Sequence, residues 1–196
     1  MGNKAFTISI NELGVSQLYL SQDKIKNISL WPDPHKANYE PLPVKDFMGC
    51  GKYVLTDGHT RAYKIYKSGV GDILVSIDDD EIVTCDMGAK LYKEFIRWCN
   101  RFSVHSIKDL ECRIISGKEY DFLWIERCDR LYNLMTALEN AVITDRAYTK
   151  LRRAGEQKNL LLYGADKELA CYYYEDLSGN LWLYSNGRFT VEYSVS

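Results

Sequence analysis

Short apolar runs alternate with polar turns over the first 80 residues, a pattern typical of a compact unit of strands and short helices. Strand patterns occur at residues 6–10, 41–44, 52–56 and 72–77. Ser21 is a candidate N-cap for a helix over residues 22–31, which Pro32 would end. A second helical pattern over residues 62–68 stops at Gly69.

From residue 81 to about residue 140 the apolar positions recur with helical spacing. Four consecutive acids at residues 78–81 precede this segment and suit the positive end of a helix dipole. One stripe contains Leu91, Phe95, Trp98 and Cys99, and a later one runs from Trp124 to Leu138. Between them, Ser106 is expected to cap a helix that extends to residue 114. Residues 141–158 are polar and basic and suit a linker or a peripheral helix.

The tail changes to strand patterns at residues 160–163, 169–174, 181–184 and 189–193. Asn186-Gly187 is a good signal for a two-residue hairpin turn. We therefore predict an α+β fold in three segments. These are an α/β unit at residues 1–80, a helical segment at residues 81–158, and a small antiparallel β meander at residues 159–196.

Composition places the chain among globular proteins, with 46% hydrophobic and 27% charged residues in 196. The net charge of -2 gives no general attraction for a phosphate backbone. No apolar run approaches the roughly 20 residues that span a bilayer, and no secretory leader pattern is present. The six cysteines form no C-x-x-C pair or zinc template. We expect reduced cysteines, no membrane association and a cytoplasmic location.

The richest chemistry lies in the turn Asp57-Gly58-His59-Thr60-Arg61, between a strand pattern and a helix pattern. The first N–H groups of a helix lack partners within it and favour anions. Arg61 opposes the helix dipole by about 0.3–1 kcal/mol, a penalty that a bound phosphate would reverse. Thr60 is a candidate cap or phosphate donor, and His59 a candidate anion contact or proton shuttle. Asp57 is a candidate acid, base or Mg²⁺ contact.

The same residues also suit a structural turn without a ligand. Asp-Gly is a common turn sequence, and Arg61 would then pair with Asp57 or with the acids at residues 78–80. We expect no metal site formed by the protein alone, because Asp57 and His59 have no evident third ligand.

Residues 7–77 resemble the ParB/sulfiredoxin-like fold. The resemblance rests on the first strand, the Ser16-to-Tyr19 segment, Pro41-Leu42-Pro43-Val44, and the Asp-Gly-His-x-Arg motif before a closing strand. Asp57, Gly58, His59 and Arg61 match the box of the branch that includes a free-serine kinase. The resemblance implies binding of a nucleotide (ATP, ADP or CTP) with Mg²⁺, or of another phosphate-bearing small molecule.

For individual residues, the resemblance implies that Gly58, His59, Thr60 and Arg61 hold phosphates. Asp57 and His59 would be the catalytic residues of a small-molecule phosphotransferase. A possible opposite wall of the pocket is formed by Gln17, Tyr19 and Ser21. Three departures limit the match. His59 stands where sulfiredoxins carry a cysteine, so sulfiredoxin activity is not expected. Thr60 replaces a second histidine, and Gln17 stands near the glutamate of the kinase.

Two other functions are compatible with the sequence. The first is a ParB-like DNA-associated or regulatory protein without catalysis, using a basic face at residues 146–158. A helix-turn-helix at residues 95–114 would serve this function, but Asp109 and Glu111 would lie where DNA phosphates bind, so DNA is not the favoured partner. The second is a protein-interaction module that uses the tyrosine-rich C-terminal meander.

Overall fold

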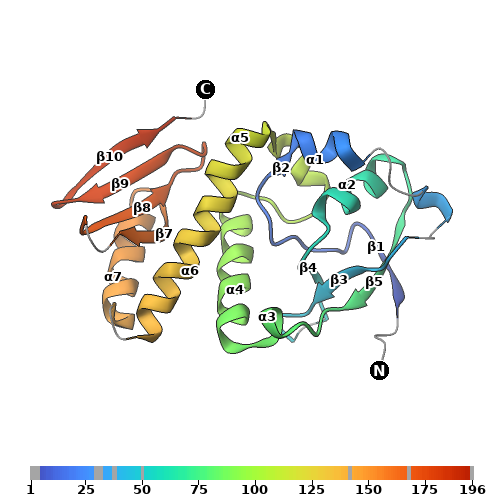
Figure 1. Cartoon of the computed structure of the whole chain (residues 1–196), viewed down its shortest axis with the longest axis horizontal. Coiled ribbons are helices and arrows are strands. Elements are labelled where there is room, and N and C mark those ends of the chain that lie inside the picture. The colour runs from blue at the N-terminus through green and yellow to red at the C-terminus, as the bar shows by residue number, and fades with distance from the viewer. Residues whose placement is uncertain are drawn as a thin grey trace. The chain divides into compact units, whose positions relative to one another are not determined.

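The structure is a computed structural model that describes residues 5–28, 33–36, 39–49, 51–140, 143–166 and 169–194. Helices and mostly antiparallel strands coexist in it, which confirms the predicted α+β class. The chain divides into two compact units, Met1–Tyr120 and Asp121–Ser196 (Figure 1). The boundary between the units falls inside the helical segment predicted for residues 81–158.

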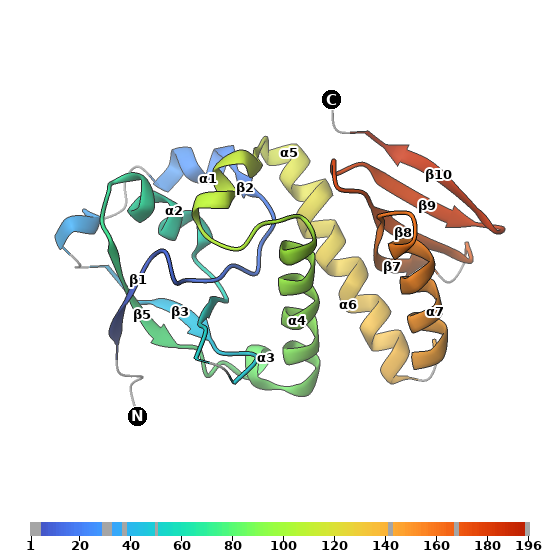
Figure 2. The ribbon, with the colours of Figure 1, turned by 180° about the vertical axis from the view of Figure 1, so that it is seen from behind.

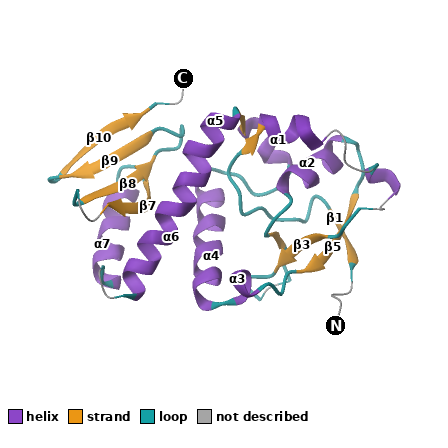
Figure 3. Ribbon diagram, in the orientation of Figure 1, coloured by secondary structure: helices purple, strands orange, loops and turns teal. Residues whose placement is uncertain are grey.

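The N-terminal unit combines a four-stranded sheet with several helices (Figure 3). Its strands are β1 (Phe6–Ser9), β2 (Leu20–Ser21), β3 (Leu42–Lys45), β4 (Val54–Leu55), β5 (Asp72–Ile77) and β6 (Ile114–Ile115). Its α-helices are α1 (Gln22–Asn27), α2 (His59–Lys67), α3 (Glu81–Thr84), α4 (Asp86–Arg101) and α5 (Gly117–Tyr120). Two 3₁₀ helices, η2 (Pro34–Lys36) and η3 (Lys108–Arg113), complete the set of described elements.

The main sheet has the order β1-β5-β3-β4 and buries its central strands. β5 pairs antiparallel with β1 and parallel with β3, so that Val75 lies opposite both Phe6 and Leu42. Leu42, Val44 and Val75 are fully buried, and they alternate along β3 and β5 with partly exposed residues, so one face of the sheet packs against the core. β4 pairs with β3 at the edge of the sheet and leads directly into α2.

Several predicted boundaries of the N-terminal unit are confirmed. Ser21 caps α1, and its side chain accepts a hydrogen bond from the Lys24 backbone N–H. The strand predicted at residues 72–77 is β5. The helix predicted at residues 22–31 is shorter, because α1 ends at Asn27 with Ile28 as its C-cap. The rest of that predicted helix, and the proline expected to end it, lie outside the described residues.

The predicted helix start at the four acids is confirmed, because Glu81 lies in the first turn of α3. In addition, Asp80 is the N-cap, and its side chain accepts a hydrogen bond from the Ile82 N–H. The prediction of an α-helix from Ser106 to residue 114 is wrong. The segment forms the 3₁₀ helix η3, and the Ser106 hydroxyl instead donates to the Asp109 carboxylate at 2.9 Å. No second α-helix therefore follows α4 within residues 102–114, as a helix-turn-helix would require.

The C-terminal unit combines two helices with an antiparallel meander (Figure 2). Its elements are a π-helical turn η4 (Asp121–Ile125), α6 (Glu126–Glu139), α7 (Asp145–Glu156), β7 (Leu161–Asp166), β8 (Cys171–Glu175), β9 (Leu181–Ser185) and β10 (Arg188–Tyr193). The predicted four-stranded meander is confirmed, with the order β10-β9-β8-β7. Asn186 and Gly187 both have positive φ, 50° and 78°, as a type I′ hairpin turn requires.

Two glycines let the helices of the C-terminal unit approach the meander closely. A Cβ on Gly164 of β7 would lie 2.7 Å from the Arg130 Cβ of α6. A Cβ on Gly155 of α7 would lie 2.5 Å from the Tyr174 ring of β8. Between α6 and β8, Arg127 and Glu175 form an ion pair of 2.5 Å in which each side chain is 1% exposed. This unit therefore has its own core, which includes a buried charge pair.

Two further expectations concern cysteines and membranes. The described cysteines, namely Cys85, Cys99, Cys112, Cys128 and Cys171, are all free thiols, and Cys50 lies outside the described residues. Cys99 is buried, as predicted for a core position. None of the described helices combines the length and apolar character needed to cross a membrane.

Candidate functional site

Helix α2 starts three residues earlier than its apolar pattern predicts. Gly58 is its N-cap, with a left-handed φ of 78° and no side-chain capping hydrogen bond. The first bond of the helix runs from the Ala62 N–H to the Gly58 carbonyl, at 2.9 Å. The N–H groups of His59, Thr60 and Arg61 therefore precede the helical ladder and are available as donors. Thr60 lies in the first turn and does not cap the helix.

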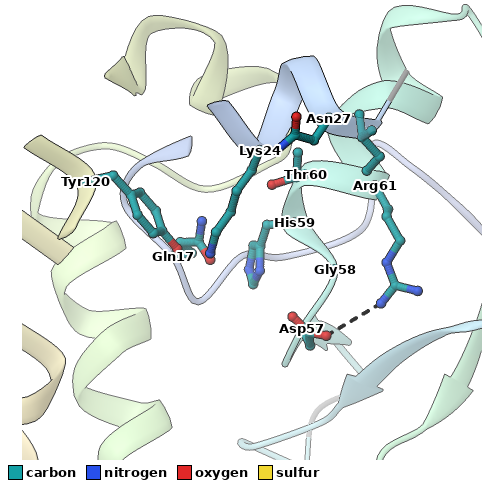
Figure 4. A pocket seen from close by; sticks show the side chains of 10 residues that line it. Gln17, Lys24, Asn27, Asp57, Gly58, His59, Thr60, Arg61 and Tyr120 are labelled. Atoms are coloured by element: carbon teal, nitrogen blue, oxygen red, sulfur yellow. Dashed lines mark hydrogen bonds and ion pairs between the residues drawn. The ribbon is translucent and has the colours of Figure 1, made fainter. Parts of the chain in front are cut away.

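A cavity of about 600 Å³ opens in front of this helix start (Figure 4). It is lined by Gln17, Lys24, Asn27, Ile28, Asp57, Gly58, His59, Thr60, Arg61 and Tyr120. The lining comes from the loop before β2, from α1, from the β4–α2 turn and from the end of α5. The structure thus brings every residue of the Asp57-to-Arg61 motif to one cavity, together with Gln17.

Two cations reach the cavity from different helices. Lys24 of α1 extends beside Tyr120, with its Nζ 4.6 Å from the centre of that ring (Figure 4). Arg61 of α2 points to Asp57, with 3.5 Å between its Nη2 and the Asp57 Oδ2. The Asp57 side chain is 82% exposed, so this pair is a weak surface interaction. An anionic ligand can therefore compete with Asp57 for the guanidinium of Arg61.

Gly58 is required by its surroundings as well as by its φ. A Cβ at this position would lie 2.9 Å from the Arg61 Nη2 and 2.9 Å from the Leu42 Cδ2. The Arg61 guanidinium thus lies against the Cα of the glycine, where other residues would project a side chain. The same glycine sets the direction of the turn and leaves room for the cation.

His59 has a different character from the other motif residues because it is almost completely buried, at 4% exposed. Its Nε2 accepts a hydrogen bond from the Ser16 N–H at 3.2 Å, which places the ring proton on Nδ1. Burial lowers the pKa of His59 to about 4, and the nearby Asp57 only partly opposes this shift. The imidazole is therefore neutral at pH 7 and does not supply positive charge to an anion.

The hydrogen bond from Ser16 belongs to a set that fixes the loop before β2. The Ser16 hydroxyl donates to the Leu55 carbonyl at 2.6 Å, and the Gly14 N–H donates to the Tyr53 carbonyl at 2.9 Å. The next residue, Gln17, donates its side-chain amide to the Tyr19 carbonyl at 2.5 Å. One wall of the cavity is thereby attached to β4 and to α2, which preorganises it.

Tyr19 and Ser21, which were predicted to line the opposite wall, do not line the cavity. They are 4% and 2% exposed. Ser21 caps α1, and Tyr19 packs its ring beneath Arg113, 5.7 Å from that guanidinium carbon. Both side chains therefore belong to the packing of the N-terminal unit, and of the three residues predicted for this wall only Gln17 lines the cavity.

Four lining residues escaped prediction: Lys24, Asn27, Ile28 and Tyr120. The first three are spaced as one face of a helix, so the pattern at residues 22–31 did contain a signal. Ile28 belongs to the apolar stripe expected for this helix, whereas Lys24 and Asn27 are polar positions that the apolar pattern does not report. The role of Tyr120 could not be predicted from the local sequence, because only tertiary folding brings residue 120 to the cavity.

The buried imidazole predicts a specific dependence of stability on pH. The unfolded chain binds a proton near pH 6.5 and the folded chain only near pH 4, so stability falls as the pH decreases between these values. The loss attributable to His59 is about 2–3 kcal/mol at about pH 4.5. Urea unfolding of the parent and of His59→Gln at pH 7.5 and 4.5 measures it. We expect the stability advantage of the parent to shrink by that amount, and a pH-independent difference would contradict the assignment.

Comparisons with known proteins add little to this geometry. No family model matches the chain, and no curated protein matches it. Among solved structures, the chain is similar to protein Atu1540 from Agrobacterium tumefaciens, at 14% sequence identity and a TM-score of 0.33. That match covers 78% of this chain and 92% of the other. A likeness this weak carries no inference, so the site is interpreted from its own residues.

Proposed function

We propose that the cavity in front of α2 binds a phosphate-bearing small molecule, and that this ligand is a nucleotide such as ATP, ADP or CTP. One observation carries the proposal. Unpaired N–H groups of the first turn of α2 and the cations Lys24 and Arg61 border the same cavity. Backbone donors at a helix start and flanking cations are the groups that bind phosphates in proteins.

The composition of the cavity also fits a nucleotide better than a bare phosphate ion. Its volume of about 600 Å³ lies within the range of small-molecule sites. Ile28 and the Tyr120 ring supply apolar surface away from the turn, where a base or sugar would lie. The exposed Asp57 carboxylate is a candidate contact for Mg²⁺ carried by the nucleotide. The resemblance to the ParB/sulfiredoxin-like fold supports the same ligand class.

Helix α1 offers a matched pair of lysines with which to test the proposal. Lys24 lines the cavity, whereas Lys26 is exposed and pairs with Asp23 at 3.8 Å. We expect Lys24→Met to weaken nucleotide binding about tenfold, since a charge-assisted hydrogen bond contributes roughly 1.5 kcal/mol. Lys26→Met makes the same change in charge on the same helix and should leave the affinity within about twofold. Equilibrium dialysis with labelled nucleotide measures both, and equal losses would refute the assignment of Lys24.

Transfer of a phosphoryl group to a small-molecule hydroxyl is a narrower proposal for the same site. Asp57 is its candidate base or Mg²⁺ contact, because its carboxylate borders the cavity and is bound only weakly by Arg61. His59, with a pKa of about 4 and its Nε2 occupied, is better suited to positioning the turn than to moving a proton. Gln17 has no basic group. Asp57→Asn should abolish any ADP release from ATP while retaining Mg²⁺-free nucleotide binding.

A further inference from the structure

We propose that the C-terminal meander binds single-stranded nucleic acid on an aromatic face. This surface is separate from the nucleotide cavity of the N-terminal unit. We call it the aromatic platform and define it by Tyr172, Trp182, Tyr184, Phe189 and Val191. The proposal rests on how the strands pair, on which part of the sheet the helices cover, and on the cations next to the exposed rings.

The strand register places the platform residues on one face of the sheet. Tyr184 lies opposite Tyr172 on β8 and opposite Phe189 on β10, and Trp182 lies opposite Val191. Directly opposed residues in an antiparallel pair share a face. The Tyr184 and Phe189 rings are in contact, with centroids 4.6 Å apart. The four platform rings thus gather on one side of three neighbouring strands, together with the buried ring of Tyr174, which lies opposite Trp182.

The helices of this unit leave the platform largely uncovered. α7 packs on the same face at the inner strands, where the Tyr174 hydroxyl donates to the Leu151 carbonyl at 3.2 Å. α6 contacts Tyr173 and Glu175, whose side chains point to the opposite face. The outer strands β9 and β10 extend beyond both helices (Figures 1 and 2). The platform rings are half-buried, and Val191 is 48% exposed.

A cavity of about 690 Å³ lies at one end of the platform. It is lined by Lys158, Leu160, Trp182, Gly187, Arg188 and Phe189. The Lys158 Nζ lies 5.7 Å from the centre of the Phe189 ring. The Trp182 indole is held in place, because its Nε1 donates to the Asp176 Oδ2 at 2.9 Å. The lining thus combines aromatic rings with two exposed cations and includes no acid.

These features indicate the kind of partner. Bases of a single strand stack on aromatic rings, and neighbouring lysines and arginines contact its phosphates. Helix α7, which ends just before Lys158, exposes three further cations, Arg146, Lys150 and Arg153. Duplex DNA keeps its bases stacked internally and could use only the cations. An uncharged apolar partner would gain nothing from them. The charge and the rings together therefore favour a single strand.

The test uses the full chain and a fluorescent oligothymidylate of about 12 nucleotides, followed by anisotropy. The duplex of the same length is the comparison ligand. We expect tighter binding of the single strand, with an affinity that falls as salt rises to about 200 mM. The charge-reversal variant K158E/R188E should bind at least tenfold more weakly. The matched variant K52E/K118E changes two exposed lysines of the N-terminal unit and should lose less than about threefold.

Three further measurements test the role of the rings, the location of the site and the oligomeric state. Trp182→Leu should weaken binding at least fivefold, whereas Trp182→Phe keeps an aromatic ring and should stay near the parent. Arg61→Ala, altered only at the nucleotide cavity, should bind the oligonucleotide like the parent. Sedimentation velocity should show a monomer, as expected if the platform is not covered by a second copy of the chain. Equal affinity for the duplex, no binding at low salt, equal losses in both charge-reversal variants, or a dimer that K158E/R188E dissociates would each overturn the proposal.

Discussion

Glu175→Gln is expected to destabilise the protein by about 3–5 kcal/mol, the largest effect on stability that we predict. Glu175 and Arg127 are each 1% exposed and form their ion pair at 2.5 Å inside the C-terminal unit. The variant would leave the guanidinium of Arg127 buried without its counter-charge. The loss is measured as a decrease in the free energy of unfolding in urea, followed by tryptophan fluorescence and circular dichroism.

Two controls identify burial as the cause of this loss. Glu126→Gln removes the partly exposed pair with Arg130 on α6, the helix that carries Arg127, at 3.2 Å, and should cost less than about 1 kcal/mol. Replacing both buried partners, Arg127→Met together with Glu175→Leu, should cost much less than the single change, because no buried charge remains. If Glu175→Gln cost no more than Glu126→Gln, the ion pair would not be a buried structural element of this unit.

Arg61→Ala is expected to cause the largest loss of function, about 10- to 150-fold in nucleotide affinity. The guanidinium would form charge-assisted hydrogen bonds to a phosphate at the start of α2, worth roughly 1.5–3 kcal/mol. Stability without ligand should hardly change. The variant loses a weak exposed contact with Asp57, and it removes a cation that opposes the helix dipole.

Lys67→Ala is the matched control for this prediction. Lys67 lies at the C-terminal end of the same helix, where it pairs with Glu111 at 2.6 Å, far along α2 from the cavity lining. Its removal should leave nucleotide affinity unchanged while lowering stability slightly. A similar loss of affinity in both variants would mean that the general charge of α2, and not the position of Arg61, controls binding.

The sequence predicted the α+β class and the order of the elements, because their apolar periods and turn residues are local signals. The hairpin at Asn186-Gly187, the cap at Ser21 and the helix start at the acids of residues 78–81 followed from side-chain chemistry within a few residues. The start of α2 did not, because its first turn is polar and carries no apolar period. The prediction for the segment after Ser106 was wrong because a polar side chain there makes a different hydrogen bond from the expected cap. Ser106 hydrogen-bonds Asp109, and the chain forms a 3₁₀ helix.

The candidate site was predictable where the chain is continuous and not where it is assembled from distant residues. The residues from Asp57 to Arg61 border one cavity, because they are consecutive in a single turn between a strand and a helix. Lys24 and Tyr120 reach that cavity only through tertiary packing. The buried state of His59 depends on the Ser16 loop, 43 residues earlier in the chain, and no local pattern reports it. The three-segment division, the ParB/sulfiredoxin-like resemblance and the nucleotide stay predictions.

The central claim is that phosphates bind at the start of α2. Isothermal titration of the full chain with ATP, ADP, CTP and inorganic phosphate, each with and without Mg²⁺, tests it most directly. We predict saturable binding of at least one nucleotide at one site per chain, lost or strongly weakened in Arg61→Ala and retained in Lys67→Ala. Absence of binding for every ligand, or binding of undiminished affinity in Arg61→Ala, would contradict the claim.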